Sequence, residues 1–228
     1  MKNILTIGLP SKGRLKESVL NFFKKNNLEL TSKGGDRDYF ASLNKLPSAK
    51  VIYLHAREII ERLGDGTLDI GISGLDLLNE STINLQKRIE ILKKLNFGKA
   101  NLVVAVPNDW IDVQTVADLE EVSFHFRDKK NLRLRVATKY PNVTNKFFVA
   151  KGVTQYKIVS SLGATETYPF TGSSEVITDI TSTGQTLKAN NLRVLKDGTI
   201  LVSQACILIS KKSKKKIARS DLSKSFRF

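Results

Sequence analysis

Apolar and polar positions alternate along the chain in a way that predicts strands and helices in turn. Short apolar runs predict strands at 4–8, 39–43, 50–54, 69–74, 88–95 and 100–106. Between them, apolar residues at helical spacing predict helices at 15–26, 58–63 and 75–78. Repeated strand–helix alternation of this kind predicts an α/β fold with a largely parallel sheet.

The second half of the chain continues this alternation. Strands are predicted at 134–138, 153–159, 192–195 and 200–209. A short helix is predicted at 115–119, and residues 139–142 are predicted to open another that has 147–149 on its apolar side. Long strands near 88–106 and 192–209 could cross between two lobes. The sequence therefore predicts two α/β lobes with a cleft between them: residues 1–95 plus 185–210 as lobe I, 96–184 as lobe II, and a basic tail at 211–228.

One stretch, from Glu175 to Lys188, combines a strand, a hydroxyl-rich turn and a helix. Residues 176–180 predict a short buried strand, 181–184 a turn of small residues, and 185–190 a helix. Such a turn can bind a phosphate, because backbone N–H groups point outward at a helix N-terminus and the helix dipole favours an anion. Asp179, just before the turn, could accept hydrogen bonds from ribose hydroxyls. The alternative is an ordinary strand-turn-helix in which Ser and Thr cap the helix.

Two further strand ends carry candidate binding residues. Lys12, Gly13 and Arg14 lie between a predicted strand and helix, where α/β proteins bind ligands. Their charges fit phosphate contact and an ordinary solvated loop equally well. Gly74 ends the strand at 69–74, where glycine permits close approach of a ring or backbone, or simply a tight turn.

The chain of 228 residues carries a net charge of +15, from 37 Lys and Arg against 22 Asp and Glu. The segment 211–228 alone holds eight basic residues and one acidic residue. This surplus suggests nucleic-acid binding. However, the chain has no nucleic-acid-binding motif and only 7% aromatic residues. An anionic small-molecule substrate or a general lysine bias explains the charge, so no nucleic-acid partner is expected.

Several classes of protein are excluded by what the sequence contains. No apolar run approaches the ~18 residues that cross a bilayer, so no membrane span is expected. The N-terminus enters a strand directly without a leader, which predicts a cytoplasmic protein. Cys206 lies in an apolar run and is predicted to be a buried hydrophobe, and two histidines leave little for a zinc site or a His-based triad.

Five collinear segments are spread along residues 4–209: Pro10–Leu15, Asp69–Asp76, Arg135–Asn142, Gly163–Glu166, and Asp179–Leu187 followed by Asn191 and Leu192. Together they resemble the short form of ATP phosphoribosyltransferase, the family that begins histidine biosynthesis. The resemblance implies two lobes like those of type II periplasmic binding proteins. It also implies ATP and phosphoribosyl pyrophosphate as substrates, Mg²⁺ as cofactor, and phosphoribosyl-ATP and pyrophosphate as products.

The resemblance further implies residue roles. Phosphoribosyl pyrophosphate would be held by Glu166, Asp179, Thr181, Ser182, Thr183, Gly184 and Thr186. The nucleotide would be held by Lys12, Gly13, Arg14, Gly74 and Asp76, and the catalytic residues would be Arg37, Arg57 and Asp179. Lys139 could reach a phosphate or cap its own helix. Because N1 of ATP attacks the ribose C1 while pyrophosphate leaves, no protein nucleophile is needed.

The resemblance also predicts a partner. The short form works with a catalytically inactive relative of histidyl-tRNA synthetase, which implies a hetero-oligomer. This sequence departs from the family at Tyr168–Phe170, which is bulkier than the expected small residues, and at Gln185. The tail at 211–228 is an extension without a counterpart. The alternative interpretation is a two-lobed protein that binds an anionic ligand without catalysis.

Overall fold

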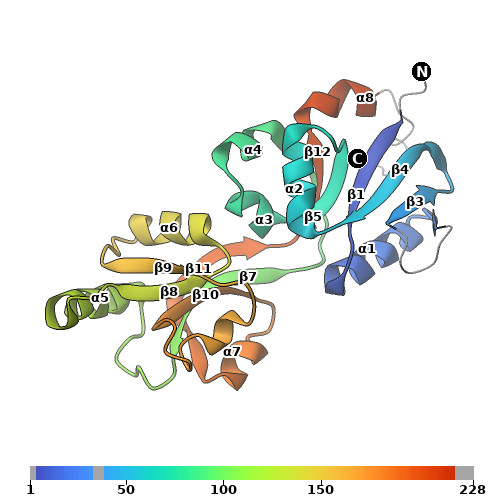
Figure 1. The fold of residues 1–228 in the computed structure, drawn as a ribbon. Helices are drawn as coiled ribbons and strands as arrows, with labels where there is room; N and C mark the ends of the chain where they lie inside the picture. Colours follow the sequence, from blue (N-terminus) through green and yellow to red (C-terminus); the bar gives the residue numbers. More distant parts are fainter. Residues whose placement is uncertain (1–3, 33–38, 219–228) are drawn as a thin grey trace. The chain divides into compact units, whose positions relative to one another are not determined.

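The computed structural model describes residues 4–32 and 39–218, and it divides the chain into two α/β units (Figure 1). Unit 1 consists of Met1–Gly98 and Gln204–Phe228, and unit 2 consists of Lys99–Ser203. The chain thus enters unit 2 once and returns once, and each unit has its own sheet. The predicted two-lobed α/β fold is confirmed.

In its described residues, unit 1 has a seven-stranded sheet with the order β2-β3-β4-β1-β5-β12-β6. Its strands are β1 (Leu5–Pro10), β2 (Leu30–Thr31), β3 (Phe40–Leu43), β4 (Leu46–Leu54), β5 (Ile70–Gly74), β6 (Ile89–Lys94) and β12 (Ala205–Ser210). Its helices are α1 (Gly13–Lys25), α2 (Ala56–Asp65), α3 (Leu75–Glu80), α4 (Ile83–Arg88) and α8 (Lys214–Ala218), with the 3₁₀ turn η3 (Lys211–Ser213). Strand β1 runs parallel to β4 and β5, and the remaining pairs are antiparallel.

Side chains on the two faces of this sheet pack against different helices, because successive residues of a strand point to opposite faces. Ile7 of β1 belongs to the same apolar cluster as Phe23 of α1. Cys206 and Leu208 of β12 cluster instead with Ile59 of α2. Cys206 is fully buried, and burial raises the pKa of its thiol, so its predicted role as a small core residue is confirmed.

Unit 2 has a five-stranded sheet in the order β11-β7-β10-β8-β9. Its strands are β7 (Ala100–Pro107), β8 (Leu134–Thr138), β9 (Tyr156–Ser160), β10 (Val176–Thr181) and β11 (Leu192–Ser203), and its helices are α5 (Val116–Lys130), α6 (Pro141–Ala150) and α7 (Gln185–Ala189), with the 3₁₀ turn η2 (Thr165–Thr167). Strand β8 runs parallel to β9 and β10, whereas β7 is antiparallel to β10 and β11. Helices α5 and α6 share one apolar cluster, and Leu187 of α7 belongs to another.

The structure corrects the predicted boundary between the lobes. Residues 185–203 were expected in lobe I, but they belong to unit 2 because β11 pairs antiparallel with β7 from Leu192↔Pro107 to Ser203↔Ala100. The apolar run expected as one strand at 200–209 is instead divided between β11 and β12 at Gln204.

Two other expectations about the elements were wrong. The sheets are mixed rather than largely parallel, because β6, β7, β11 and β12 all pair antiparallel with their neighbours. The helix expected at 115–119 extends to Lys130, with Thr115 and Asp118 forming a reciprocal capping box at its start. The sequence also predicts a turn at 33–38 that leads into the strand at 39–43, and this turn lies outside the described residues. Within the described ranges, no helix is long and apolar enough to cross a membrane.

The first part of the predicted basic tail is not separate from unit 1. Residues 211–218 form η3 and α8, where Ile217 is buried in the α1-side core. The buried carboxylate of Asp69 accepts hydrogen bonds from Ser213 Oγ (2.6 Å), Lys216 Nζ (2.6 Å) and the Thr6 backbone N–H (2.8 Å). Burial alone would raise the pKa of Asp69, but these hydrogen bonds hold it below its ordinary value. One carboxylate therefore links β1 to the segment 211–218.

We expect Asp69→Asn to lower the free energy of unfolding by about 2–3 kcal/mol at pH 7, because a charged acceptor is lost from a buried site. A depressed carboxyl pKa stabilises the fold above the ordinary pKa, and that contribution disappears as the pH falls through the folded value. The difference between variant and wild type should therefore shrink below about pH 4.

The measurement is urea unfolding as a function of pH. Glu90→Gln is the matched control, since it removes the more exposed pair between Glu90 and Lys214. That change should cost less than about 1 kcal/mol. Equal losses in the two variants would contradict the role assigned to Asp69.

Candidate functional site

The turn after β10 is held in shape by its own hydroxyl groups. Thr181 Oγ1 accepts a hydrogen bond from the Gly184 N–H (2.9 Å), and Thr183 Oγ1 accepts a longer one from the Gln185 N–H (3.4 Å). Gly184 has φ of 74° and is the N-cap of α7, without a side-chain cap. Ser182, Thr183 and Thr186 are exposed. The predicted strand, turn and helix are therefore present, and hydroxyls from both turn and helix reach solvent.

Asp179 lies two residues before this turn and is half-buried. Its Oδ1 accepts a hydrogen bond from the Ile180 N–H (2.9 Å). Burial raises the pKa of the Asp179 carboxyl; the Ile180 N–H and the nearby charge of Lys139 oppose the rise, and the charge of Glu166 adds to it. The structure thus brings Glu166, Asp179 and Lys139 together. A carboxyl whose pKa is shifted by burial and nearby charges is characteristic of a binding or catalytic position.

Three buried threonines that the sequence did not single out lie behind these residues. Thr178 Oγ1 donates to Thr138 Oγ1 (2.7 Å) and is hydrogen-bonded to Thr144 Oγ1 (2.6 Å). Thr138 Oγ1 also accepts from the Tyr140 N–H (2.9 Å). The chain of hydroxyls joins β10, the end of β8 and α6, so it fixes the loop that carries Lys139. The available sequence signal was a threonine in each of two apolar strand runs, Thr138 at the end of β8 and Thr178 in β10.

The described residues contain no group of three or more His, Cys, Asp or Glu side chains that could hold a metal by themselves. Glu166 and Asp179 provide two carboxylates close enough to influence each other. Mg²⁺ commonly takes one or two protein carboxylates and completes its octahedron with water and substrate phosphates. This pair fits a Mg²⁺ ion shared with a phosphorylated substrate.

In unit 1, the predicted nucleotide residues follow three neighbouring strands. The order β4-β1-β5 is parallel, so the loops after these strands meet at one edge of the sheet. After β1, Lys12 lies in the loop and Gly13 and Arg14 begin α1. Arg57 lies in the first turn of α2, after β4. Gly74 ends β5, and Asp76 lies in the first turn of α3.

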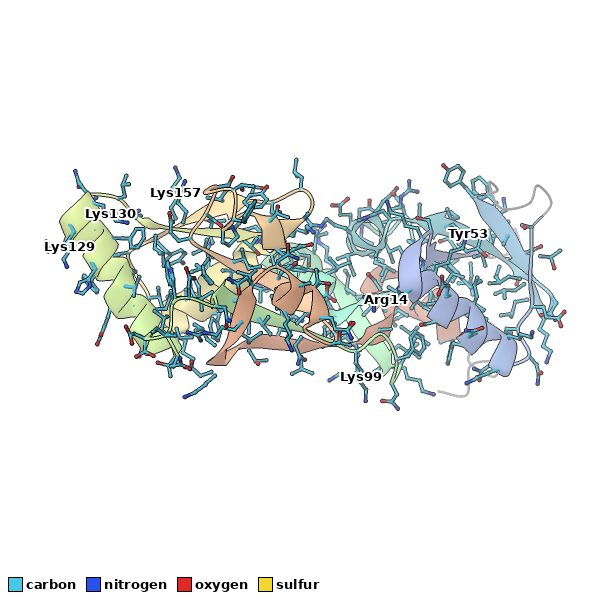
Figure 2. All side chains as sticks on the ribbon, turned by 90° about the horizontal axis from the view of Figure 1, so that it is seen from below. Arg14, Tyr53, Lys99, Lys129, Lys130 and Lys157 are labelled. Atoms are coloured by element: carbon cyan, nitrogen blue, oxygen red, sulfur yellow. The ribbon has the colours of Figure 1, made fainter. Side chains whose placement is uncertain are left out.

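These unit 1 residues differ in exposure and in what holds them. Arg14 and Arg57 are exposed, and Arg14 lies at the start of α1 (Figure 2). Gly13 has φ of 76°, which favours glycine. The close approach expected at Gly74 is made by Asp76 in the first turn of α3, whose Oδ1 lies too close to Gly74 to leave room for a Cβ. Arg37 lies outside the described residues.

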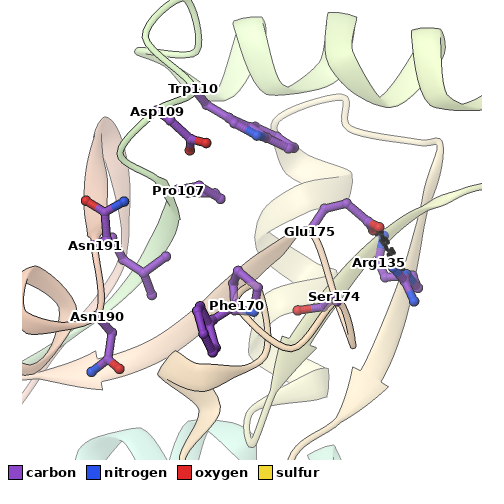
Figure 3. Close-up of a pocket in the computed structure, with 12 residues that line it drawn as sticks. Pro107, Asp109, Trp110, Arg135, Phe170, Ser174, Glu175, Asn190 and Asn191 are labelled. Atoms are coloured by element: carbon purple, nitrogen blue, oxygen red, sulfur yellow. Dashed lines mark hydrogen bonds and ion pairs between the residues drawn. The ribbon is translucent and has the colours of Figure 1, made fainter.

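A separate cavity of about 370 Å³ lies in unit 2 at the edge of the sheet opposite the turn (Figure 3). It borders the start of β8 and β10 and the end of β7, whereas the turn follows the end of β10. The cavity is lined by Pro107, Asp109, Trp110, Arg135, Pro169, Phe170, Gly172, Ser174, Glu175, Asn190, Asn191 and Leu192. None of these residues was predicted as part of a site, because they come from four separate segments.

The two units share the fold of solute-binding proteins. The probable amino-acid-binding protein YtmK from Bacillus subtilis superposes with a TM-score of 0.55 at 12% identity, covering 98% of this chain and 90% of that one. The alkanesulfonate-binding protein SsuA from Xanthomonas axonopodis superposes with a TM-score of 0.54 at 15% identity, covering 93% and 67%. Fold and turn together define a two-lobed α/β protein with a candidate phosphate-binding site.

The family follows from closer relatives. The family model for ATP phosphoribosyltransferase, HisG, matches residues 55–226. ATP phosphoribosyltransferases from Nitrobacter winogradskyi and Mesorhizobium japonicum are 48% and 47% identical over 93% and 92% of this chain. The HisG:HisZ complex of Thermotoga maritima contains a chain with a TM-score of 0.74 and 25% identity, covering 98% of this chain and 94% of that one. The chain belongs to the ATP phosphoribosyltransferase family.

The relatives differ in length. This chain spans 66% of the Nitrobacter protein and 91% of the Mesorhizobium protein. Family membership confirms the resemblance carried by the five sequence segments.

We expect Gly184→Ala to destabilise the protein by about 1 kcal/mol, because an added Cβ is strained at positive φ. Nothing lies within 4 Å of the position that a Cβ would take, so the cost comes from the backbone alone. Gly184→Asn should cost less, since asparagine tolerates the left-handed region.

Chemical denaturation of the variants measures these costs. Gly163→Ala is the control, because Gly163 has equally open surroundings and no left-handed φ. Its effect should stay within about 0.5 kcal/mol. A Gly184→Ala protein as stable as Gly163→Ala would show that the turn does not need this conformation.

Proposed function

We propose that this chain transfers the phosphoribosyl group of phosphoribosyl pyrophosphate to N1 of ATP. The products are phosphoribosyl-ATP and pyrophosphate, in the first step of histidine biosynthesis. The observation that carries the proposal is the hydroxyl-lined turn at 181–184 with Asp179 at its base, in a chain of this family. The turn suits the 5′-phosphate, and the carboxylate suits the ribose hydroxyls.

The reaction requires positioning more than a reactive side chain. As the C1–N1 bond forms, the bond between C1 and pyrophosphate breaks and its electron pair leaves with pyrophosphate. The adenine ring gains a positive charge, which is discharged by loss of a proton from the exocyclic amine. Alignment of two bound reactants can lower the barrier by ~7–11 kcal/mol. The protein must therefore hold both anions and neutralise the leaving group.

We assign the two partners of the reaction to different units. Glu166, Asp179 and the hydroxyls of Thr181, Ser182, Thr183 and Thr186, with the Gly184 backbone, hold phosphoribosyl pyrophosphate on unit 2. On unit 1, Lys12, Gly13, Arg14, Gly74 and Asp76 hold the nucleotide, and Arg57 meets the pyrophosphate. Arg37 is assigned the same task as Arg57 from the family resemblance. The shared sheet edge in unit 1 supports this division.

We also propose that the protein works with Mg²⁺. Asp179 and Glu166 are the residues that would hold the ion on the protein side. When bound to phosphate oxygens, the ion neutralises negative charge on the leaving pyrophosphate. The raised pKa of Asp179 supports this role, because a nearby cation would favour the charged carboxylate.

We further propose a cytoplasmic enzyme that forms a hetero-oligomer with a histidyl-tRNA-synthetase-like subunit. The Thermotoga maritima neighbour, whose structure is that of a HisG:HisZ complex, supports this partner. The competing candidate is a two-lobed binding protein without catalysis, which the likeness to solute-binding proteins favours at the level of fold alone. Turnover of ATP and phosphoribosyl pyrophosphate, followed by product absorbance, distinguishes the two.

Asp179→Ala and Arg57→Ala should each lower kcat/KM by at least ~10-fold, equivalent to about 1.4 kcal/mol of transition-state binding. The first change removes the ribose contact and the second removes a cation facing pyrophosphate. Steady-state kinetics with both substrates, with the regulatory subunit present, provides the measurement.

Arg62→Ala is the matched control on α2, because Arg62 pairs with Glu58 along the helix (2.7 Å). It should change kcat/KM by less than about 2-fold, as expected for an exposed i,i+4 pair. Normal rates in both Asp179→Ala and Arg57→Ala would show that the site is misplaced.

Co-expression with a histidyl-tRNA-synthetase-like protein from the same genome should give a complex of higher mass and higher turnover than this chain alone. Light scattering coupled to size exclusion measures the mass, and the product assay measures the turnover. Full activity of this chain alone, without complex formation at micromolar concentration, would contradict the proposed partner.

A further inference from the structure

The cavity at the far edge of the unit 2 sheet has the composition of a site for a flat ring. Figure 3 shows the Trp110 indole and the Phe170 ring projecting toward it from opposite sides, with Pro107 between them. Phe170 is 94% exposed, so its ring is not needed by the core. Asn190 and Asn191 lie along one flank and provide amide groups. A volume near 370 Å³ falls within the range of about 300–1,000 Å³ that is usual for small-molecule sites.

We propose that this cavity binds an uncharged heteroaromatic ring with adjacent hydrogen-bond donors and acceptors, such as an aminopurine base. Aromatic side chains stack on such rings, and an asparagine amide can pair with the donor and acceptor edge of adenine. The cavity is separate from the residues of unit 2 that are proposed to hold phosphoribosyl pyrophosphate, which lie at the opposite edge of the unit 2 sheet.

The charges around the cavity favour a neutral ligand over a phosphorylated one. Glu175 and Arg135 neutralise each other through hydrogen bonds at 2.6 Å from Arg135 Nη2 and 2.7 Å from the Arg135 backbone N–H. The remaining charged residue of the lining is Asp109. The lining therefore carries one net negative charge, in a chain whose overall charge is +15. Asp109 can accept a hydrogen bond from an exocyclic amine and would repel a phosphate.

Two short connections join this cavity to the proposed phosphate turn. Asn190 ends α7, and its Nδ2 donates to the carbonyl of Thr186 (2.9 Å), which belongs to the turn's helix. The segment from Pro169 to Glu175 joins η2, which carries Glu166, to β10, which carries Asp179. Binding in the cavity therefore changes the affinity of the turn for its ligand. This coupling rests on the proposed function, whereas binding of the ring does not.

Trp110 is the single tryptophan of the chain, so its fluorescence reports directly on the cavity. Adenosine should produce a saturable change when the full chain is excited selectively at tryptophan. Phe170→Ala and Asn191→Ala should each weaken adenosine binding by about 5-fold or more, as loss of base stacking or pairing commonly does. AMP should bind more weakly than adenosine. The Asp109→Asn change should reduce the difference between the affinities for these two ligands.

Phe124→Ala is the matched control, because Phe124 is another exposed phenylalanine of unit 2, is 51% exposed and does not line the cavity. It should leave adenosine affinity within about 2-fold, as for surface changes outside a site. Circular dichroism confirms that each variant is folded. No saturable signal with adenosine, or equal affinity in Phe170→Ala, Asn191→Ala and wild type, would overturn the proposal.

Coupling is tested by repeating the adenosine titration with phosphoribosyl pyrophosphate present. The adenosine Kd should shift, and linkage requires the same factor in the reverse titration. An unchanged Kd would overturn the coupling. Normal turnover without adenosine binding would reject only the proposal that the cavity binds a heteroaromatic ring. Adenosine binding without turnover would reject only the proposed function.

Discussion

Parallel pairing of a few central strands is the constraint on which the rest of this protein depends. Parallel strands point their carboxyl ends to the same edge, so loops far apart in sequence meet there. In unit 1 this holds for β4, β1 and β5, and in unit 2 for β9, β8 and β10. Each proposed substrate residue within the described ranges follows such a strand or lies near its carboxyl end. The backbone groups of these buried strands are hydrogen-bonded to neighbouring strands, so the position at which each loop begins is fixed.

The same arrangement explains why Asp179 can be kept in an unfavourable environment. Burial and a nearby like charge disfavour its carboxylate, and the Ile180 N–H and Lys139 only partly offset them. The threonine chain behind it, from Thr138 through Thr178 to Thr144, is buried and hydrogen-bonded. A satisfied polar network of this type holds neighbouring groups in place. A cation or ribose hydroxyls at this position would relieve the electrostatic cost, which links substrate binding to the stability of unit 2.

Local sequence patterns predicted the bounds of elements that have a clear apolar period. They failed where the structure depends on pairing between segments that are distant in the sequence. Strand 134–138 was predicted to the residue, because it is a short apolar run with a charged flank. Helix α5 was underestimated because its apolar period is weak beyond Leu119: Val122 and Phe126 continue the face that packs on the core, but Phe124 is exposed on another face. The lobe boundary was misplaced because β11 selects β7 as its partner, and no local pattern encodes that pairing.

Features that depend on distant contacts were missed for the same reason. The tail was expected to be separate, yet Lys216 reaches Asp69 across 147 positions of sequence. The strand, turn and helix that follow Glu175 are contiguous in the chain, so this arrangement was predicted from the sequence, and its binding of phosphate stays a proposal. The cavity beside Trp110 is assembled from four segments, so only the fold reveals it.

Helix α7 gives unit 2 a mechanical link between its two edges. It has five residues, Gln185–Ala189, and is capped by Gly184 of the turn at one end and by Asn190 beside the cavity at the other. Leu187 is the buried residue that anchors it, and both the backbone and the side chain of Asn190 hydrogen-bond to the Thr186 carbonyl. A helix this short, with one buried side chain and hydrogen bonds between its ends, is expected to be rigid. In the coupling proposed above, a displacement at Asn190 moves α7 about Leu187 and thereby moves the hydroxyls of the turn.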